Sequence, residues 1–198
     1  MYQKYTGIIL KKHPFGEADE LLTIYSRENG KIRVKAVSVR KPLSKLAGHL
    51  QSLNEIEFEV AARTKHLPVM ISARALAVNN YLRQNLRKFG FALVGIETLY
   101  RLTGDGQENT EAYNELRAFL NNLGETHEEN LALRRFQLQL LAANGYAFPV
   151  QAQTNADFTL TRADNFQLTS TLEKEIDQFI DYILEREIKS VKFLTEIS

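Results

Sequence analysis

The spacing of apolar residues changes near Val78, and this change constrains the fold more than any other feature of the chain. Before Val78, apolar and polar residues alternate in Lys31–Ala36 and Glu55–Val60, and this alternation predicts β-strands. After Val78 the spacing approaches 3.6 residues, which predicts amphipathic helices. We therefore expect an α+β protein, with a β domain over residues 1–78 and a mainly α-helical domain over residues 79–198.

The β domain is expected to contain five strands. They are Tyr5–Lys12, Leu21–Ser26, Lys31–Ala36, Glu55–Val60 and Val69–Ala77. The third strand places Lys31, Arg33 and Lys35 on one face and apolar residues on the other. A long connection, Ser38–Leu53, follows this strand. Five strands with a long third connection indicate a small Greek-key barrel of the OB-fold type.

The helical domain is expected to contain four helices. They are Leu82–Tyr100, Tyr113–Leu123, a helix from Thr126 to near Gly145 and a helix from Ser170 to Leu184. Gly124 is expected to end the second helix in the left-handed conformation. Two pairs of residues have the spacing of capping boxes, Thr126 with Glu129 and Ser170 with Glu173. A short hairpin is expected at Phe158–Leu168.

The residues offer little chemistry for catalysis. The chain has no cysteine, which excludes disulfides, thiol nucleophiles and cysteine-based zinc sites. It also lacks the sequence motifs of phosphate loops, zinc proteases and serine hydrolases. The four histidines are scattered, and Glu55, Glu57 and Glu59 are expected to form an exposed row on one strand face. We expect no enzyme, no metal and no cofactor; a hydrolase using scattered carboxylates or histidines is the weaker alternative.

The chain is expected to act in the cytoplasm. No apolar stretch is long enough to span a membrane, and the N-terminus lacks the pattern of a secretory signal. We therefore expect no membrane partner.

Positive charge is concentrated in the predicted barrel. Residues 1–78 carry 13 Lys and Arg against 7 Asp and Glu, a net charge of +6, whereas residues 79–198 carry 12 against 17, a net charge of −5. This asymmetry indicates a polyanion-binding part joined to an acidic part. The candidate DNA contacts are Lys31, Arg33, Lys35, Arg40, Lys41 and Lys45. Tyr25 is a candidate surface for base stacking. The alternative is that the cations of the third strand only pair with glutamates across strands.

Several segments resemble the RecO family of bacterial recombination mediators. In the first half these segments are Gly7–Lys11, Phe15–Thr23, Gly30–Val34 and Arg40–Gln51. Farther along they are Leu133–Leu141, Asn144–Tyr146 and Ile188–Leu194. The resemblance spans nearly the whole chain, and it implies an N-terminal OB-fold that binds DNA and a C-terminal helical domain.

The resemblance also implies a function and partners. Members of the family are expected to bind single- and double-stranded DNA non-specifically, to anneal strands and to help load recombinase onto DNA coated by single-stranded DNA-binding protein. Their partners are RecR and the acidic, aromatic-ended tail of that binding protein, and the candidate tail contacts are Arg134, Arg135, Phe136 and Leu138. This function implies a location at the nucleoid.

Two expectations follow from a comparison with this family pattern. Many relatives carry four cysteines that bind zinc, so the cysteine-free segment near residues 150–170 is expected to be a short metal-free insertion. The alternative function is a protein-interaction adaptor whose basic barrel face binds an acidic protein rather than DNA.

Overall fold

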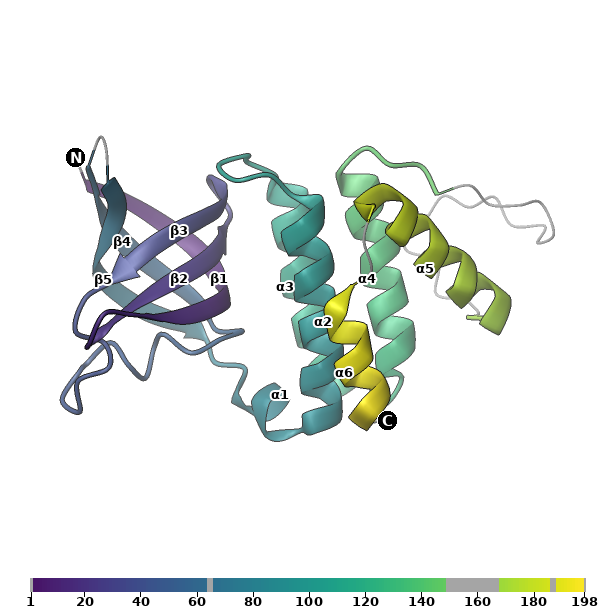
Figure 1. Ribbon diagram of the computed structural model, residues 1–198, viewed down its shortest axis with the longest axis horizontal. Coiled ribbons are helices and arrows are strands. Elements are labelled where there is room, and N and C mark those ends of the chain that lie inside the picture. Colours follow the sequence, from purple (N-terminus) through teal and green to yellow (C-terminus); the bar gives the residue numbers. More distant parts are fainter. Residues whose placement is uncertain (1, 64–65, 149–167, 186–187, 198) are drawn as a thin grey trace. The chain divides into compact units, whose positions relative to one another are not determined.

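The computed structural model describes residues 2–63, 66–148, 168–185 and 188–197, and its first part is a closed barrel (Figure 1). The strands are β1 (Tyr2–Phe15), β2 (Asp19–Ser26), β3 (Gly30–Ala36), β4 (Glu55–Arg63) and β5 (His66–Ala77). Their order around the barrel is β1-β2-β3-β5-β4. The β3–β5 pair is parallel, and the other neighbours are antiparallel. This five-stranded Greek-key barrel confirms the predicted OB-fold.

Alternating side chains fill the barrel. In β3, Val34 and Ala36 are fully buried and Ile32 packs against the same core, whereas Arg33 is exposed. The predicted alternation of this strand is therefore confirmed. Strand β4 adds three buried side chains to the same core, Ile56, Phe58 and Val60. Burial of these apolar side chains is the main force that holds the strands together.

The chain forms two compact units. The first consists of Met1–Asn80 with Thr103–Arg117, and the second consists of Tyr81–Leu102 with Ala118–Ser198. We call Thr103–Arg117 the covering segment, because it packs on the barrel although it lies far along the sequence. The boundary expected between residues 78 and 79 stays a prediction.

A glycine allows the covering segment to approach the turn between β2 and β3. Gly30 has a φ of +59°, and a Cβ at this position would lie 1.8 Å from the carbonyl oxygen of Gln107. The adjacent Gly106 donates its backbone N–H to the carbonyl oxygen of Lys31 at 2.9 Å. Only glycine combines this backbone conformation with so close a contact.

The helices are α1 (Asn80–Gln84), α2 (Leu86–Leu102), α3 (Thr110–Glu125), α4 (Glu129–Ala143), α5 (Ser170–Leu184) and α6 (Lys189–Ile197). Where the sequence predicts one helix over Leu82–Tyr100, the structure has two. Asn85 causes the break, because its side chain accepts a hydrogen bond from the backbone N–H of Lys88 at 3.0 Å and so caps α2. Within the described ranges, no helix has the length and apolar character needed to cross a membrane.

Two predictions about the ends of α3 and α4 are wrong. Gly124 does not end α3 but lies inside it, where a Cβ would come within 2.3 Å of the Tyr81 ring. Its small size, rather than its conformational freedom, therefore explains the glycine. The N-cap of α4 is Glu128, and the Thr126 hydroxyl accepts from the backbone N–H of Glu128 before the helix begins. The expected capping box is thus absent at α4.

The start of α5 is also displaced from its prediction. Thr169, rather than Ser170, is the N-cap, and its hydroxyl accepts from the backbone N–H of Leu172 at 3.2 Å. The two hydroxyl residues are adjacent, so the sequence alone could not choose between them. The hairpin expected at Phe158–Leu168 lies outside the described residues except for its last position, and most of the expected metal-free insertion lies outside them too.

Candidate nucleic-acid interface

Lys31, the first cation of β3, is buried under the covering segment. Only 7% of the residue is exposed. Its Nζ donates to the carbonyl oxygen of Thr103 at 2.7 Å and lies 3.3 Å from a carboxylate oxygen of Asp105. A lysine held in this way is engaged inside the protein, and it is poorly placed to reach a phosphate.

Arg33 shares an acid with Lys31 but remains accessible. One of its terminal nitrogens lies 3.5 Å from the other carboxylate oxygen of Asp105, and about half of its side chain is exposed. Ion pairs between exposed groups are weak, because water competes with each partner. Arg33 can therefore exchange this partner for a phosphate at little cost.

Lys35 lies at the other end of β3, beside different residues. Its Nζ lies 2.9 Å from a carboxylate oxygen of Asp19 and 5.0 Å from the centre of the Phe15 ring. The hydrogen bond from Lys35, followed by that from the Ser38 backbone N–H, lowers the pKa of Asp19. The three cations of β3 share a face as predicted, but their partners are aspartates rather than glutamates: Asp105 of the covering segment for Lys31 and Arg33, and Asp19 of the neighbouring strand β2 for Lys35.

The turn between β1 and β2 binds the start of the long connection after β3. The Ser38 backbone N–H donates to Asp19 at 2.8 Å, and the Arg40 backbone N–H donates to the carbonyl oxygen of Ala18 at 2.9 Å. The Arg40 guanidinium also contacts two carbonyl oxygens of this turn, those of Gly16 at 3.5 Å and Glu17 at 3.4 Å. These bonds bring Arg40 to the turn that directly follows Phe15.

The remaining candidate cations are exposed on the long connection. Arg40, Lys41 and Lys45 all face solvent there. Hydrogen bonds such as that from the Ser44 backbone N–H to the Lys41 carbonyl oxygen, at 3.0 Å, shape this connection into successive turns. Together with Lys35 and Phe15, these three cations form what we call the loop cluster. Its three exposed cations offer positive charge of the kind that binds a phosphate backbone.

Phe15 is the residue of the loop cluster that sequence reasoning missed. It is 41% exposed at the end of β1. Tyr25, the residue expected to provide a stacking surface, is fully buried, and this burial raises the pKa of its hydroxyl to about 12. The expectation for Tyr25 is therefore wrong. An aromatic residue between Lys11-Lys12 and the Gly16 turn was the available sign of Phe15.

The glutamates of β4 do not form the expected exposed row. Glu55 is only 6% exposed, and it accepts hydrogen bonds from the Tyr113 hydroxyl at 2.6 Å and the Arg117 Nε at 3.1 Å. Burial and the bond to Glu55 raise the pKa of Tyr113. Glu57 instead pairs at the surface with Lys4 at 3.0 Å. Glu55 therefore binds the covering segment to the barrel, whereas Glu57 makes surface ion pairs.

The second unit does not present the expected partner contacts as an apolar surface. Phe136 and Leu138 are 2% and 1% exposed, and the Phe136 ring stacks on Phe119 with centroids 4.6 Å apart. Arg134 forms an ion pair with Asp177 on α5. A role for Arg134–Leu138 in partner binding stays a prediction, but its two apolar members belong to the helical core.

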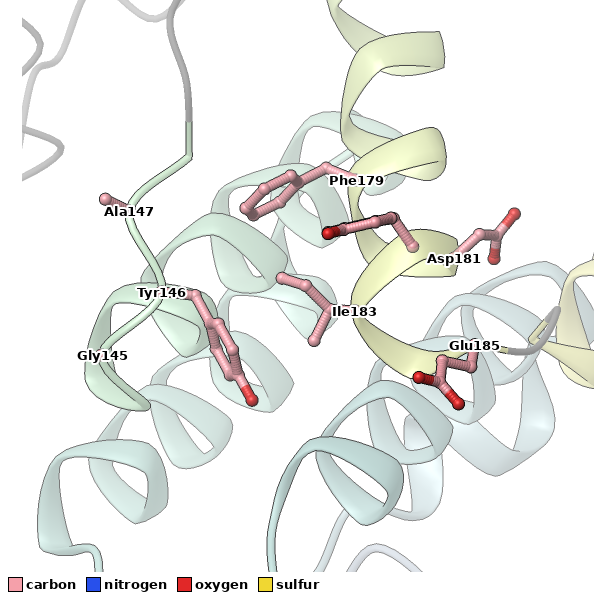
Figure 2. A pocket seen from close by; sticks show the side chains of 8 residues that line it. Gly145, Tyr146, Ala147, Phe179, Asp181, Ile183 and Glu185 are labelled. Atoms are coloured by element: carbon pink, nitrogen blue, oxygen red, sulfur yellow. The ribbon is translucent and has the colours of Figure 1, made fainter.

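A cavity of about 690 Å³ lies elsewhere in the second unit. Figure 2 shows Tyr146 and Phe179 facing it, with Asp181 and Glu185 nearby. The two acids give this cavity the wrong charge for DNA or for an acidic peptide tail. Across the described parts of the chain, no group of three or more His, Cys, Asp or Glu residues could hold a metal ion.

Comparison with known proteins gives matches over most of the chain. Residues 1–78 match the family model for the N terminal part of recombination protein O, and residues 83–159 match the model for its C terminal part. A protein named DNA repair protein RecO from Pelotomaculum thermopropionicum is 32% identical over 143 residues, which cover 72% of this chain and 55% of the relative. Its namesake from Acaryochloris marina is 37% identical over 155 residues, 75% of this chain and 51% of the relative.

A third relative of the same name, from Dehalococcoides mccartyi, is 29% identical over 163 residues, which cover 82% of this chain and 64% of the relative. The chain therefore spans between about half and two thirds of the length of the curated relatives that it matches.

Proposed function

The chain belongs to the RecO family, and from this premise we propose that it acts in DNA repair and recombination by binding DNA through its barrel. The observation that carries the proposal is the loop cluster, in which Arg40, Lys41 and Lys45 are exposed on the connection that follows Lys35. Arg33 extends the set along β3. We leave Lys31 out of it, because its ammonium group is buried against Thr103 and Asp105.

The proposed interaction is non-specific and binds both single- and double-stranded DNA. Exposed cations on a loop suit phosphates, which carry no sequence information, rather than the edges of particular bases. Annealing follows from the same chemistry, since cations that screen the repulsion between two phosphate backbones allow complementary strands to approach. In this mechanism no bond is made or broken, and the protein acts without being an enzyme.

The partners of the protein are proposed from its family alone. We infer that it helps to load recombinase onto DNA coated by single-stranded DNA-binding protein, by contacting RecR and the tail of that binding protein. Such a role places it at the nucleoid in the cytoplasm. A pull-down with immobilised tail peptide, with a peptide of scrambled order as its control, tests the tail contact independently of DNA.

Fluorescence anisotropy of a labelled oligonucleotide across a salt series tests DNA binding. Contacts from Arg33, Lys35, Arg40, Lys41 and Lys45 to a single strand predict a log–log slope of about −3.5, at about −0.7 for each neutralised phosphate. The double variant Arg40→Glu with Lys41→Glu should bind more weakly, with a slope of about −2.1.

The matched control is the double variant Lys174→Glu with Lys189→Glu, which reverses two exposed lysines of the second unit. It changes the net charge by the same amount and should retain the slope of the wild type. Absence of DNA binding at low salt would contradict the proposal and would favour the adaptor that binds an acidic protein. Equal losses in the two double variants would show that net charge, rather than the loop cluster, determines binding.

A further inference from the structure

Phe15 occupies an unusual position for a large apolar side chain. It ends β1, it remains 41% exposed, and the turn that begins at Gly16 directly follows it. A single exposed apolar residue is common on protein surfaces. What distinguishes Phe15 is its surroundings, because the Lys35 ammonium lies 5.0 Å from the ring centre and Arg40 is bound to the same turn.

The local hydrogen bonds hold these three side chains near one another. The Asp19 carboxylate binds the Lys35 ammonium and accepts a hydrogen bond from the Ser38 backbone N–H. These two contacts connect the end of β3 to the start of β2. The Arg40 backbone N–H donates to the carbonyl oxygen of Ala18 at 2.9 Å and so holds the start of the long connection against the β1–β2 turn. An accessible aromatic ring therefore lies beside the Lys35 ammonium, and Arg40 is bound to the turn that directly follows the ring.

We propose that Phe15 is a stacking platform for an unpaired nucleobase, while Lys35 and Arg40 bind the phosphates on either side of it. The inference rests on the proposed DNA-binding function and makes it more specific. An aromatic ring stacks on any base, because every base has a π face. In a duplex the bases are already stacked and paired, so their faces are not available to Phe15. The platform would therefore give the barrel a preference for single strands that the cations alone cannot supply.

Substitution of Phe15 separates stacking from charge. Phe15→Ala should weaken binding to a single strand about tenfold, in line with the measured contribution of one base–aromatic stack. Binding to a duplex of the same length should change less than about twofold, since only the cations take part. Phe15→Leu keeps an apolar side chain without a ring and should behave like Phe15→Ala. Phe15→Tyr keeps the ring and should retain the single-strand preference.

A tryptophan at the same position reports stacking directly. The chain contains no tryptophan, so Phe15→Trp introduces a unique fluorophore. An oligothymidine should quench its emission, whereas an abasic oligonucleotide with the same number of phosphates should not. Tyr2→Trp is the matched control, because Tyr2 is 78% exposed at the opposite end of the same strand. Its emission should not respond to either oligonucleotide.

The outcomes distinguish this inference from the proposed function beneath it. Suppose that the wild type binds both single strands and duplexes. If Phe15→Ala then leaves both affinities unchanged, or lowers both equally, the stacking platform is wrong and the proposed DNA binding stands. If the abasic oligonucleotide quenches the Phe15→Trp emission as much as oligothymidine does, the stacking platform is likewise wrong and DNA binding stands. If the wild type binds neither form at low salt, both proposals fail together.

Discussion

Lys31→Met offers a sharp test of how the structure divides the cations of β3. Methionine keeps most of the apolar stem of Lys31 but removes the ammonium group that reaches Thr103 and Asp105. The bond to the Thr103 carbonyl oxygen is short, at 2.7 Å, and a hydrogen bond with a charged partner contributes about 1.5–3 kcal/mol. The Asp105 side chain is 58% exposed, so its ion pair adds at most about 1 kcal/mol. We expect the free energy of unfolding to fall by about 2 kcal/mol.

Urea denaturation followed by circular dichroism measures this loss. With an m-value of about 2 kcal/mol per molar urea, the midpoint of the barrel transition should fall by about 1 M. Arg33→Met is the matched control, because Arg33 approaches the same aspartate at 3.5 Å but is half exposed. It should change the free energy of unfolding by less than about 0.5 kcal/mol.

For DNA affinity we expect the opposite order: Arg33→Met should have the larger effect and Lys31→Met the smaller. Lys31→Met should leave the dissociation constant for a single strand within about twofold, since its ammonium does not reach the surface, whereas Arg33→Met should remove one phosphate contact and reduce the salt slope by about 0.7. A Lys31→Met protein with normal stability and reduced DNA affinity would refute the assignment of Lys31 to the interior.

Four further substitutions, one of them a control, test other parts of the structure. Tyr25→Phe should raise stability by about 1 kcal/mol in urea denaturation, because the buried Tyr25 hydroxyl finds no hydrogen-bond partner among the described residues. Leu50→Ala should lower stability by about 2–5 kcal/mol, because Leu50 is fully buried, whereas Leu43→Ala, at a residue that is 95% exposed, should change it by less than about 0.5 kcal/mol. Burial raises the pKa of Glu97, but hydrogen bonds from Ser190 and the α6 backbone outweigh it and lower the pKa overall. A lowered folded-state pKa gives stability that is present above the unfolded value and lost as pH falls through the folded value. When the pH is lowered below about 4.5, the thermal midpoint of the Glu97→Gln variant should therefore decrease less than that of the wild type.

The sequence predicts the barrel well because its pattern is local. Alternation in Lys31–Ala36 and Glu55–Val60 requires only neighbouring residues, and the structure has strands at both places. The position of a helix end depends on which nearby side chain caps the backbone, and the apolar spacing does not show this. Asn85 could have been recognised as an N-cap, but the apolar spacing on both sides of it favoured one continuous helix.

The exposure of the cations could not be predicted from the alternation. Lys31 and Arg33 occupy equivalent positions of the pleat, yet Lys31 is buried because Thr103 and Asp105 return to it from about seventy residues farther along the chain. Tyr25, the cross-strand neighbour of Lys31 on β2, is buried as well. A period of two assigns a residue to a face, whereas its burial depends on what distant segment packs there.

These long-range contacts explain why the proposed interface moves from the strand to the loops. The covering segment occupies the Lys31 end of β3, and Asp19 with the β1–β2 turn binds the Lys35 end. Each contact fixes a cation that an isolated strand would present to solvent. The long connection after β3 is different, because its hydrogen bonds are mainly between backbone groups and leave Lys41 and Lys45 exposed. Lys41 and Lys45 are therefore accessible to phosphates, while the ion pair of Lys35 with Asp19 and the end of β1 hold Lys35 and Phe15 in place for the proposed unpaired base.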